Sequence, residues 1–181
     1  MFKDIKEQFP IFKNKTNGKE LVYLDSANSS QKPQTVIDAV SNFYSNEFAN
    51  VGRGIYSLAV NASEKYELTR SNLKSFIGAS DDYEIVFTKN ATESLNLVAS
   101  CFAEKFIEEG DEIILTEVEH HANYVPWHYL RKRKGAIIKF LPIDENGDLK
   151  VDELEKLISK KTKIISVTHM SNVTGSITPL K

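Results

Sequence analysis

The chain has 181 residues, of which 41% are hydrophobic and 27% charged, and its formal net charge is −2. This composition is ordinary for a globular protein, and the length suits one compact domain with its own core. No stretch approaches the roughly 20 apolar residues of a membrane span. The N-terminus also lacks the apolar region of a secretory signal, so we expect a cytoplasmic protein with no membrane role.

The single cysteine and one basic run bear on the redox compartment and on nucleic-acid binding. Cys101 cannot form an internal disulfide, which agrees with a reducing compartment. It lies within the apolar stretch of a predicted helix, so we expect a buried, structural thiol. The run "RKRK" (131–134) closes another predicted helix just before Gly135, where cations complement the helix dipole. A nucleic-acid surface needs a broader basic footprint, so no nucleic-acid partner is expected.

Strand-length apolar runs and helical patterns follow one another along the chain. A short strand is expected at residues 20–25, followed by helices at 32–48 and 57–79. From there strands and helices alternate regularly: strand 83–88, helix 91–107, strand 111–118, helix 123–134, strand 136–143, helix 150–160 and strand 162–170. This alternation predicts an α/β fold, a mostly parallel sheet with flanking helices, whose ligands bind at the carboxyl ends of the strands.

The first of these strand ends is expected to form an anion site. Asn90 is expected to cap a helix that opens at Ala91. The cap leaves backbone N–H groups and the Thr92 hydroxyl pointing toward the sheet edge, where they would attract a phosphate. An ordinary N-cap explains the same residues, so the motif alone is weak.

Two further strand ends carry polar residues. His120 and His121 follow strand 111–118, while Ser171 and Asn172 follow strand 162–170. Loop histidines and polar turns often have purely structural roles, so neither feature is specific alone. Together with the helix opening, they supply a phosphate cradle, a planar imidazole and a neutral amide. A flat, phosphorylated cofactor would use all three.

Metal binding and serine hydrolysis are the competing interpretations. The histidines available as metal ligands are His120, His121, His128 and His169. The first two are adjacent rather than spaced along a helical face, and no His-Glu-x-x-His pattern occurs, so no metal site is predicted. A serine hydrolase would need a Gly-x-Ser-x-Gly motif, which the sequence lacks.

Three segments resemble the class V, fold type I, pyridoxal-phosphate enzymes: "YLDSANSSQKP" (23–33), "TEVEHHANYVPW" (116–127) and "THMSNVTGSITPL" (168–180). Within that family the sequence is most similar to the SufS/CsdA-like group of cysteine desulfurases and selenocysteine lyases. The resemblance implies that residues 57–181 form part of the cofactor-binding large domain. Residues 1–56 are then expected to form an N-terminal segment with a short strand and a helix.

The resemblance also implies a role for each strand-end residue. His120 would stack its ring on the pyridine face of pyridoxal 5′-phosphate. Thr92 and neighbouring amides, including that of Ala91, would bind the phosphate, and Asn172 would approach the ring hydroxyl. His121 would then be a structural neighbour.

The same resemblance places other residues near the substrate or in the core. Ala27, Asn28 and Arg53 would lie near the amino-acid substrate. Trp127 and His128 are expected to pack within the helix that follows the histidine pair.

The sequence departs from the family pattern at several positions. In "NVGRGIYSL" Gly52 and Tyr56 stand where the desulfurase group commonly has histidines, while Arg53 and Gly54 are kept. In the phosphate loop Ala91 replaces a hydroxyl residue, although Thr92 stays. Phosphate binding is therefore more secure than the identity of the substrate.

Several catalytic groups of the family have no counterpart in these 181 residues. No histidine is followed by the lysine that would form the Schiff base, and the aspartate for the pyridine nitrogen, the carboxylate-binding arginine and the loop cysteine have no match. We therefore expect an N-terminal portion that ends before the lysine and is inactive alone, with no catalytic residue of its own.

For the intact enzyme the resemblance implies a cysteine desulfurase, which converts cysteine to alanine and leaves an enzyme-bound persulfide. A homodimer that passes sulfur to an acceptor protein is the expected assembly. The alternatives are another class V aminotransferase or lyase, or a non-catalytic module if the chain ends at Lys181.

Overall fold

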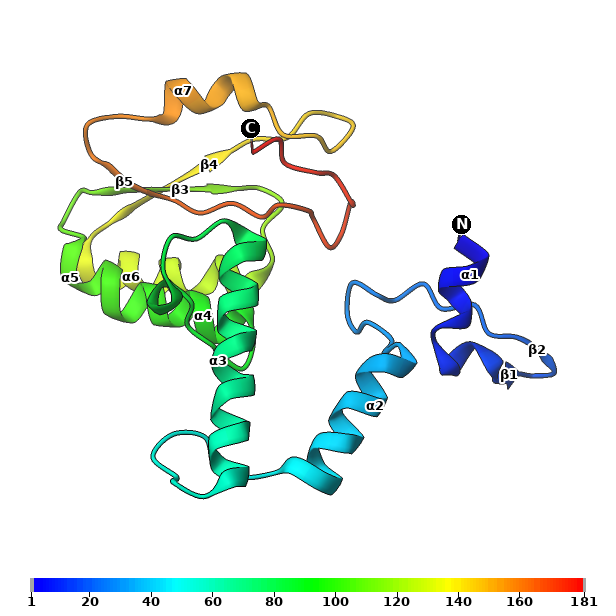
Figure 1. The fold of residues 1–181 in the computed structure, drawn as a ribbon. Coiled ribbons are helices and arrows are strands. Elements are labelled where there is room, and N and C mark those ends of the chain that lie inside the picture. The colour runs from blue at the N-terminus through cyan, green and yellow to red at the C-terminus, as the bar shows by residue number, and fades with distance from the viewer. Residues whose placement is uncertain (1, 181) are drawn as a thin grey trace. The chain divides into compact units, whose positions relative to one another are not determined.

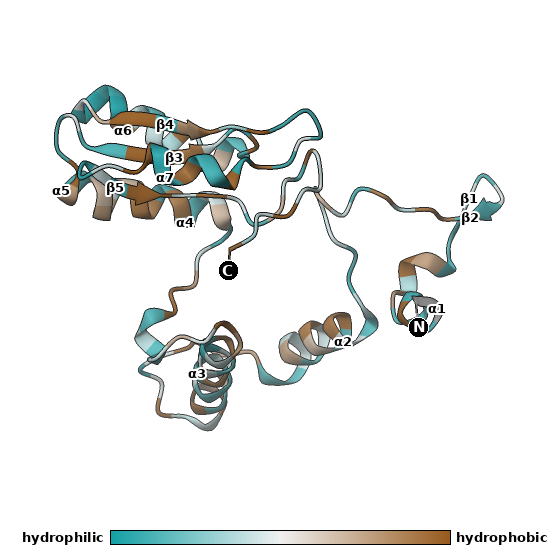
Figure 2. Ribbon diagram, turned by 90° about the horizontal axis from the view of Figure 1, so that it is seen from above, coloured by the Kyte–Doolittle hydropathy of each residue, from teal (hydrophilic) through white to brown (hydrophobic). Residues whose placement is uncertain are grey.

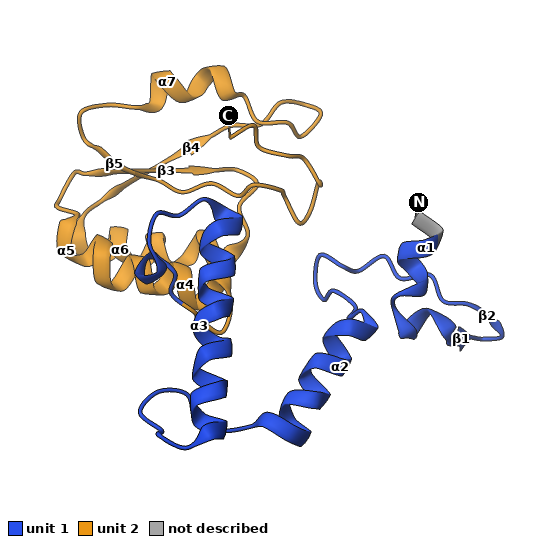
Figure 3. Ribbon diagram, in the orientation of Figure 1, with its two compact units in different colours: residues 1–86 blue, residues 87–181 orange. Residues whose placement is uncertain are grey.

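The computed structural model describes residues 2–180, and it divides into two compact units, residues 1–86 (unit 1) and 87–181 (unit 2) (Figure 3). Each unit is built from its own local contacts and is described separately below. No helix within residues 2–180 is long and apolar enough to cross a membrane.

Unit 1 is mainly helical. Its helices and strands are α1 Phe2–Glu7, β1 Lys15–Thr16, β2 Lys19–Glu20, α2 Gln34–Asn42 and α3 Ser57–Ile77 (Figure 1). A π-helical turn, Phe43–Glu47, extends α2, so the predicted helix 32–48 is confirmed. The predicted helix 57–79 is confirmed as α3, which ends at Gly78 with a left-handed φ of 73°. Glycine favours this cap because it carries no Cβ.

Two strands predicted around unit 1 are wrong. The only pairing near 20–25 is a hairpin, in which Asn17 (φ 54°) and Gly18 (φ 75°) connect β1 to β2. This Asn-Gly pair is the usual sign of a tight hairpin turn. Residues 83–88 begin in a 3-10 turn, Asp82–Glu84. Ile85 is extended (φ −96°, ψ 113°), but the described residues offer it no neighbouring strand, and a strand requires a pairing partner.

Unit 2 has the predicted α/β architecture. Its sheet has the order β4-β3-β5, with β3 Glu112–Thr116, β4 Ile137–Leu141 and β5 Thr162–Ile165 all parallel. Hydrophobic residues run along β4 and β5 (Figure 2). Helices α4, α5 and α6 lie on one face of the sheet and α7 on the other (Figure 1). This arrangement confirms strands 111–118 and 136–143.

The helices of unit 2 largely follow the predicted pattern. One continuous helical segment consists of α4 Ala91–Leu97, a π-helical turn Val98–Ala103 and α5 Glu104–Phe106. A 3-10 turn, His121–Asn123, leads into α6 Val125–Lys134, which ends at Gly135 with φ 73°. The helix predicted at 150–160 is shorter: it is a 3-10 turn, Val151–Glu153, followed by α7 Leu154–Leu157.

The core of unit 2 lies between β3 and the helices α4 to α6. Ile113 and Leu115 alternate along β3 and are fully buried. They pack with the other buried members of the core, Ala99, Ala103, Ile107, Trp127, Leu130 and Ala136. This face of the sheet is therefore covered by an apolar cluster.

Cys101 is exposed, so its predicted burial is wrong. Ala99 and Ala103 are one helical turn apart and face the sheet, with 4% and 0% of their surface exposed. Cys101 lies midway between them in the sequence, which directs it to the opposite side of the helix. The exposed side of this helical segment also carries apolar residues, since Phe102 and Phe106 are each 53% exposed. Periodicity therefore could not identify the buried face.

A polar cluster stabilises the amino end of β3. The Glu112 carboxylate lies 2.8 Å from Lys139 Nζ and accepts hydrogen bonds from the hydroxyls of Ser159 (2.7 Å) and Thr162 (3.0 Å). These contacts lower the pKa of Glu112 to about 2. The hydrogen bond from Lys139 is the main cause, and the hydroxyl of Ser159 is the next. The cluster ties the beginnings of β3 and β5 together.

Candidate functional site

The candidate site is the carboxyl edge of the sheet in unit 2. Parallel pairing brings the ends of β3, β4 and β5 to one edge. The helical segment that begins with α4 runs beside α6 in the same direction. Its first part, α4, contacts the 3-10 turn His121–Asn123, and near its end Glu104 pairs with Arg133 at 2.9 Å. Both helices therefore begin at the carboxyl edge of the sheet.

The beginning of α4 offers hydrogen-bond donors. The Asn90 side chain accepts the Glu93 N–H at 2.9 Å, and the Glu93 carboxylate accepts the Lys89 N–H at 2.6 Å. Asn90 thus caps the helix, and Glu93 ties the residue before the cap to the first turn. Within the described residues no acceptor receives the N–H groups of Ala91 and Thr92, and both residues are exposed. An anion would find two amides and a hydroxyl here.

His120 projects from the loop after β3. Its Nδ1 accepts the Ala122 N–H at 3.1 Å, and its carbonyl accepts the Asn123 N–H at 2.8 Å. Because Nδ1 accepts, the neutral ring carries its proton on Nε2. The ring is exposed and stands edge-on to His121, with 6.2 Å between centroids. One flat face is thus available to a ligand.

The segment after β5 contributes the third group. The strand predicted at 162–170 is shorter and ends at Ile165. The Ser166 N–H still donates to the Ile114 carbonyl of β3 at 2.9 Å, and the chain then turns to polar contacts with the loop after β3. The Thr168 N–H, for example, donates to Glu119 at 2.8 Å. Ser171 is buried, and its hydroxyl accepts the N–H groups of Val173 and Thr174, so the exposed amide of Asn172 is the group that a ligand could reach.

The predicted substrate residues lie in unit 1, on two exposed loops. Ala27 and Asn28 belong to a turn in which the Asn28 N–H donates to the Asp25 carbonyl at 3.2 Å. Arg53 is exposed and forms no ion pair within the part of the chain that the structure describes.

The family departures at residues 52 and 56 have local structural explanations. Gly52 has a φ of 117°, a backbone conformation that residues other than glycine rarely adopt. The Tyr56 hydroxyl donates to Asn50 Oδ1 at 2.5 Å, across the same loop. Both residues therefore shape the loop that presents Arg53.

Sequence reasoning missed two residues of the site, Glu119 and Asn123. Glu119 accepts hydrogen bonds from Thr116 Oγ1 (2.7 Å), Thr168 N (2.8 Å) and Asn123 Nδ2 (2.7 Å). Asn123 is 7% exposed and also bonds Ser166 and Trp127. The sequence signal for them was that they flank the histidine pair, four residues apart.

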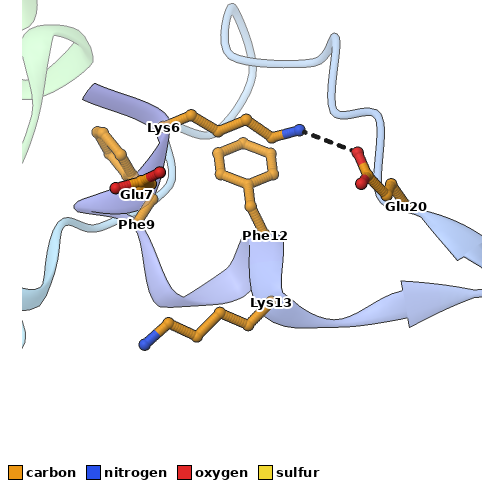
Figure 4. Close-up of a pocket in the computed structure, with 6 residues that line it drawn as sticks. All are labelled: Lys6, Glu7, Phe9, Phe12, Lys13 and Glu20. Carbon is orange, nitrogen blue, oxygen red and sulfur yellow. Dashed lines mark ion pairs between the residues drawn. The ribbon is translucent and has the colours of Figure 1, made fainter. Parts of the chain in front are cut away.

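Hollows occur in both units, and the one in unit 2 borders this constellation at Glu119 and His121. One of about 540 Å³ in unit 1 is lined by Lys6, Phe9, Phe12 and Glu20, among others, with Lys6 placed between Phe12 and Glu20 (Figure 4). Another of about 390 Å³ in unit 2 lies beside His121. No group of three His, Cys, Asp or Glu residues in the described chain could hold a metal ion.

The family model for class-V aminotransferases matches residues 22–181. The chain belongs to the class V aminotransferase family. A cysteine desulfurase of Pectobacterium atrosepticum is 44% identical over 98% of this chain and 44% of its own length. The chain spans less than half the length of the first curated relatives that it matches.

Solved structures of family relatives share the fold. The apo cysteine desulfurase of Thermococcus onnurineus NA1 has 38% identity and a TM-score of 0.86, over 97% of this chain and 42% of that one. SspA in complex with cysteine has 27% identity and a TM-score of 0.77, over 88% and 45%. The predicted α/β fold of a fold type I enzyme is thereby confirmed.

This family depends on pyridoxal phosphate, and the donors at the sheet edge suit such a group. Amides and a hydroxyl at a helix start suit a phosphate, and an exposed flat imidazole suits an aromatic ring. The residues present therefore fit the cofactor.

Proposed function

We propose that the protein carrying this chain is a pyridoxal-phosphate-dependent cysteine desulfurase. The printed names of its relatives support this proposal, since proteins about 44% identical to the chain are named cysteine desulfurases. A more distant relative of known structure holds cysteine itself. A cysteine substrate is therefore the proposed choice among amino acids.

One observation carries the cofactor part of the proposal. The unpartnered N–H groups of Ala91 and Thr92 and the exposed ring of His120 belong to segments that begin at the same sheet edge. We propose that Ala91 and Thr92 donate to the phosphate, that His120 covers one face of the pyridine ring, and that the Asn172 amide bonds the ring oxygen.

When bound, pyridoxal phosphate supplies a pyridine ring that withdraws electrons from the amino-acid substrate. The residues of this chain would hold that ring in a fixed position. The phosphate contacts anchor one end, and the imidazole restricts rotation and keeps water from one face. Because Nδ1 of His120 is engaged by Ala122, only Nε2–H is free to donate.

The proposal also covers the substrate side of the site and the assembly. Ala27, Asn28 and Arg53 are proposed to lie near the substrate, with the Arg53 guanidinium suited to a carboxylate. A homodimer, a sulfur-acceptor protein and a cytoplasmic location are also proposed. Residues 1–56 remain proposed as an N-terminal segment and residues 57–181 as part of the cofactor-binding domain.

The adjacent histidines provide a matched test. The protein should be expressed from its complete coding sequence and titrated with pyridoxal phosphate while the visible absorption of the cofactor is recorded. His120→Ala should weaken binding and abolish conversion of cysteine to alanine, whereas His121→Ala should preserve both. Equal effects of the two substitutions would contradict the assignment of His120.

The reaction products distinguish desulfurase activity from the alternatives. Alanine formed together with one equivalent of transferable sulfur supports the desulfurase. Amino-group transfer from a range of amino acids to a 2-oxo acid would instead support another class V aminotransferase. A protein that binds no cofactor would refute the whole proposal.

A further inference from the structure

Glu119 is a carboxylate that is satisfied by neutral donors alone. It lies directly before His120 and is partly buried. Its Oε1 accepts from Thr116 Oγ1 (2.7 Å) and Thr168 N (2.8 Å), and its Oε2 accepts from Asn123 Nδ2 (2.7 Å). Within residues 2–180 no cation forms an ion pair with it. A carboxylate held this way is placed for its geometry rather than for a salt bridge.

Asn123 uses all of its hydrogen-bonding capacity. Its Nδ2 donates to Glu119 and to the Ser166 carbonyl (3.1 Å), and its Oδ1 accepts from Trp127 Nε1 (2.9 Å) and Ser166 Oγ (2.6 Å). The Ser166 carbonyl can only accept and the indole N–H can only donate. The orientation of the Asn123 amide is therefore fixed by its surroundings.

This fixed orientation requires two acceptors at residue 119. The Asn123 amide presents an N–H to one oxygen of Glu119, and the Thr168 backbone presents an N–H to the other. A glutamine at this position has one acceptor and one donor, so its NH₂ would face one of these N–H groups. Glu119→Gln should thus disturb the network although it preserves the size of the side chain.

The network involves residues on both sides of His120 in the sequence. Glu119 precedes it, and the Asn123 N–H bonds its carbonyl at 2.8 Å. The same two side chains bind Ser166 and Thr168, which lie 43 to 49 residues further along the chain. The loop after β3 and the segment that leads to Asn172 are thereby held together.

We infer that Glu119 and Asn123 are positioning residues for His120. They hold the loop in which the Ala122 N–H engages Nδ1, and so set both the orientation of the ring and its Nε2–H tautomer. They also couple the ring to the segment that carries Asn172. The expected effect on pyridoxal-phosphate binding rests on the proposed function. The expected effect on the orientation and tautomer of the His120 ring does not.

The first experiment measures the ring without any cofactor. Nitrogen-15 NMR of the His120 imidazole reports which nitrogen carries the proton, and the signals can be assigned with His120→Ala. The wild-type protein should show an unprotonated Nδ1 in the neutral ring. Glu119→Gln should raise the Nδ1–H population, while Glu117→Gln, at a neighbouring exposed residue, should leave the spectrum unchanged. Unchanged His120 signals in folded Glu119→Gln would overturn the inference.

A milder variant covers the case in which Glu119→Gln does not fold. Ser166→Ala removes one of the hydrogen bonds to Asn123 Oδ1 and leaves the bond from Trp127. It should shift the His120 signals in the same direction by a smaller amount. No shift in Ser166→Ala would equally contradict the inference.

The second experiment separates positioning from stability. Glu119→Gln should weaken pyridoxal-phosphate binding about tenfold or more, because a hydrogen bond to a charged group is lost near the ring. Ile107→Val, in the distant core, should lower the melting temperature without changing affinity. Equal affinities in wild type and Glu119→Gln would overturn the cofactor consequence. A wild-type protein that binds no pyridoxal phosphate would refute the proposed function, and the NMR test would still decide the role of Glu119.

Discussion

Replacing Trp127 by phenylalanine tests the link between the core and the site. Trp127 is 1% exposed, and its Nε1–H donates to Asn123 Oδ1 at 2.9 Å. The smaller ring leaves a cavity of about 40 Å³, which at ~24 cal/mol per Å³ costs ~1 kcal/mol. The lost hydrogen bond costs another ~1 kcal/mol. We therefore expect the free energy of unfolding to fall by about 2 kcal/mol, or the melting temperature by about 4–8 °C.

The assay must not depend on tryptophan fluorescence, because Trp127 is the only tryptophan in these 181 residues. Far-ultraviolet circular dichroism during urea unfolding gives the free energy directly. Tyr129→Phe is the matched control, since Tyr129 lies on the same helix and is 56% exposed. This control should change the free energy of unfolding by less than about 0.5 kcal/mol.

A double-mutant cycle isolates the hydrogen bond from the cavity. Combining Trp127→Phe with Asn123→Ala should reveal a coupling energy of about 0.5–1.5 kcal/mol. A loss below about 0.5 kcal/mol for Trp127→Phe alone, or a coupling energy of zero, would refute the reasoning. The indole would then contribute neither packing nor a hydrogen bond to the loop of His120.

Three further predictions concern other parts of the chain. The pKa of Glu112 is about 2, below its ordinary 4.5, so its contribution to stability is present above pH 4.5 and is lost as the pH falls toward 2. The difference in stability between wild type and Glu112→Gln should shrink over that range, and a constant difference would contradict the cluster. Cys101 should react with a thiol reagent at the rate of an exposed cysteine without denaturant, and protection would contradict its exposure. Gly54→Ala should destabilise unit 1 by about 1–3 kcal/mol, because overpacking has that cost. The added Cβ would lie 2.3 Å from that of Ala59, which is fully buried. Unchanged melting would rule out this contact.

The sequence predicts best those features that depend on local chemistry. Helix α6 ends before Gly135, as predicted, because a residue in the left-handed conformation stops it there. Strand β3 was expected because Ile113, Ile114 and Leu115 form an apolar run, and all five residues of the strand are buried. The donors of Ala91 and Thr92 were also expected, since an N-cap at Asn90 leaves the same amides unpaired in any helix.

Features that depend on distant partners were not predictable from the pattern. Residues 83–88 have the composition of a strand, but pairing decides whether an extended segment joins a sheet. The segment after β5 is bonded to Glu119 and Asn123, which no local periodicity reports. The hairpin at Asn17–Gly18 is different, because its signal was present in the sequence and was overlooked.

The polar groups at the sheet edge therefore fall into two classes: those with a free hydrogen-bonding group and those already bonded to other parts of the chain. Some of these groups are free to bind a ligand within the described chain. They are the backbone amides of Ala91 and Thr92, the His120 ring and the Asn172 side-chain amide. Glu119 and Asn123, by contrast, are satisfied by one another and by backbone groups more than 40 residues away. Unsatisfied donors attract a ligand, whereas satisfied ones resist movement. The proposed site for a flat ring would use both kinds. Changing the first kind should alter what binds, and changing the second should alter how precisely it is held.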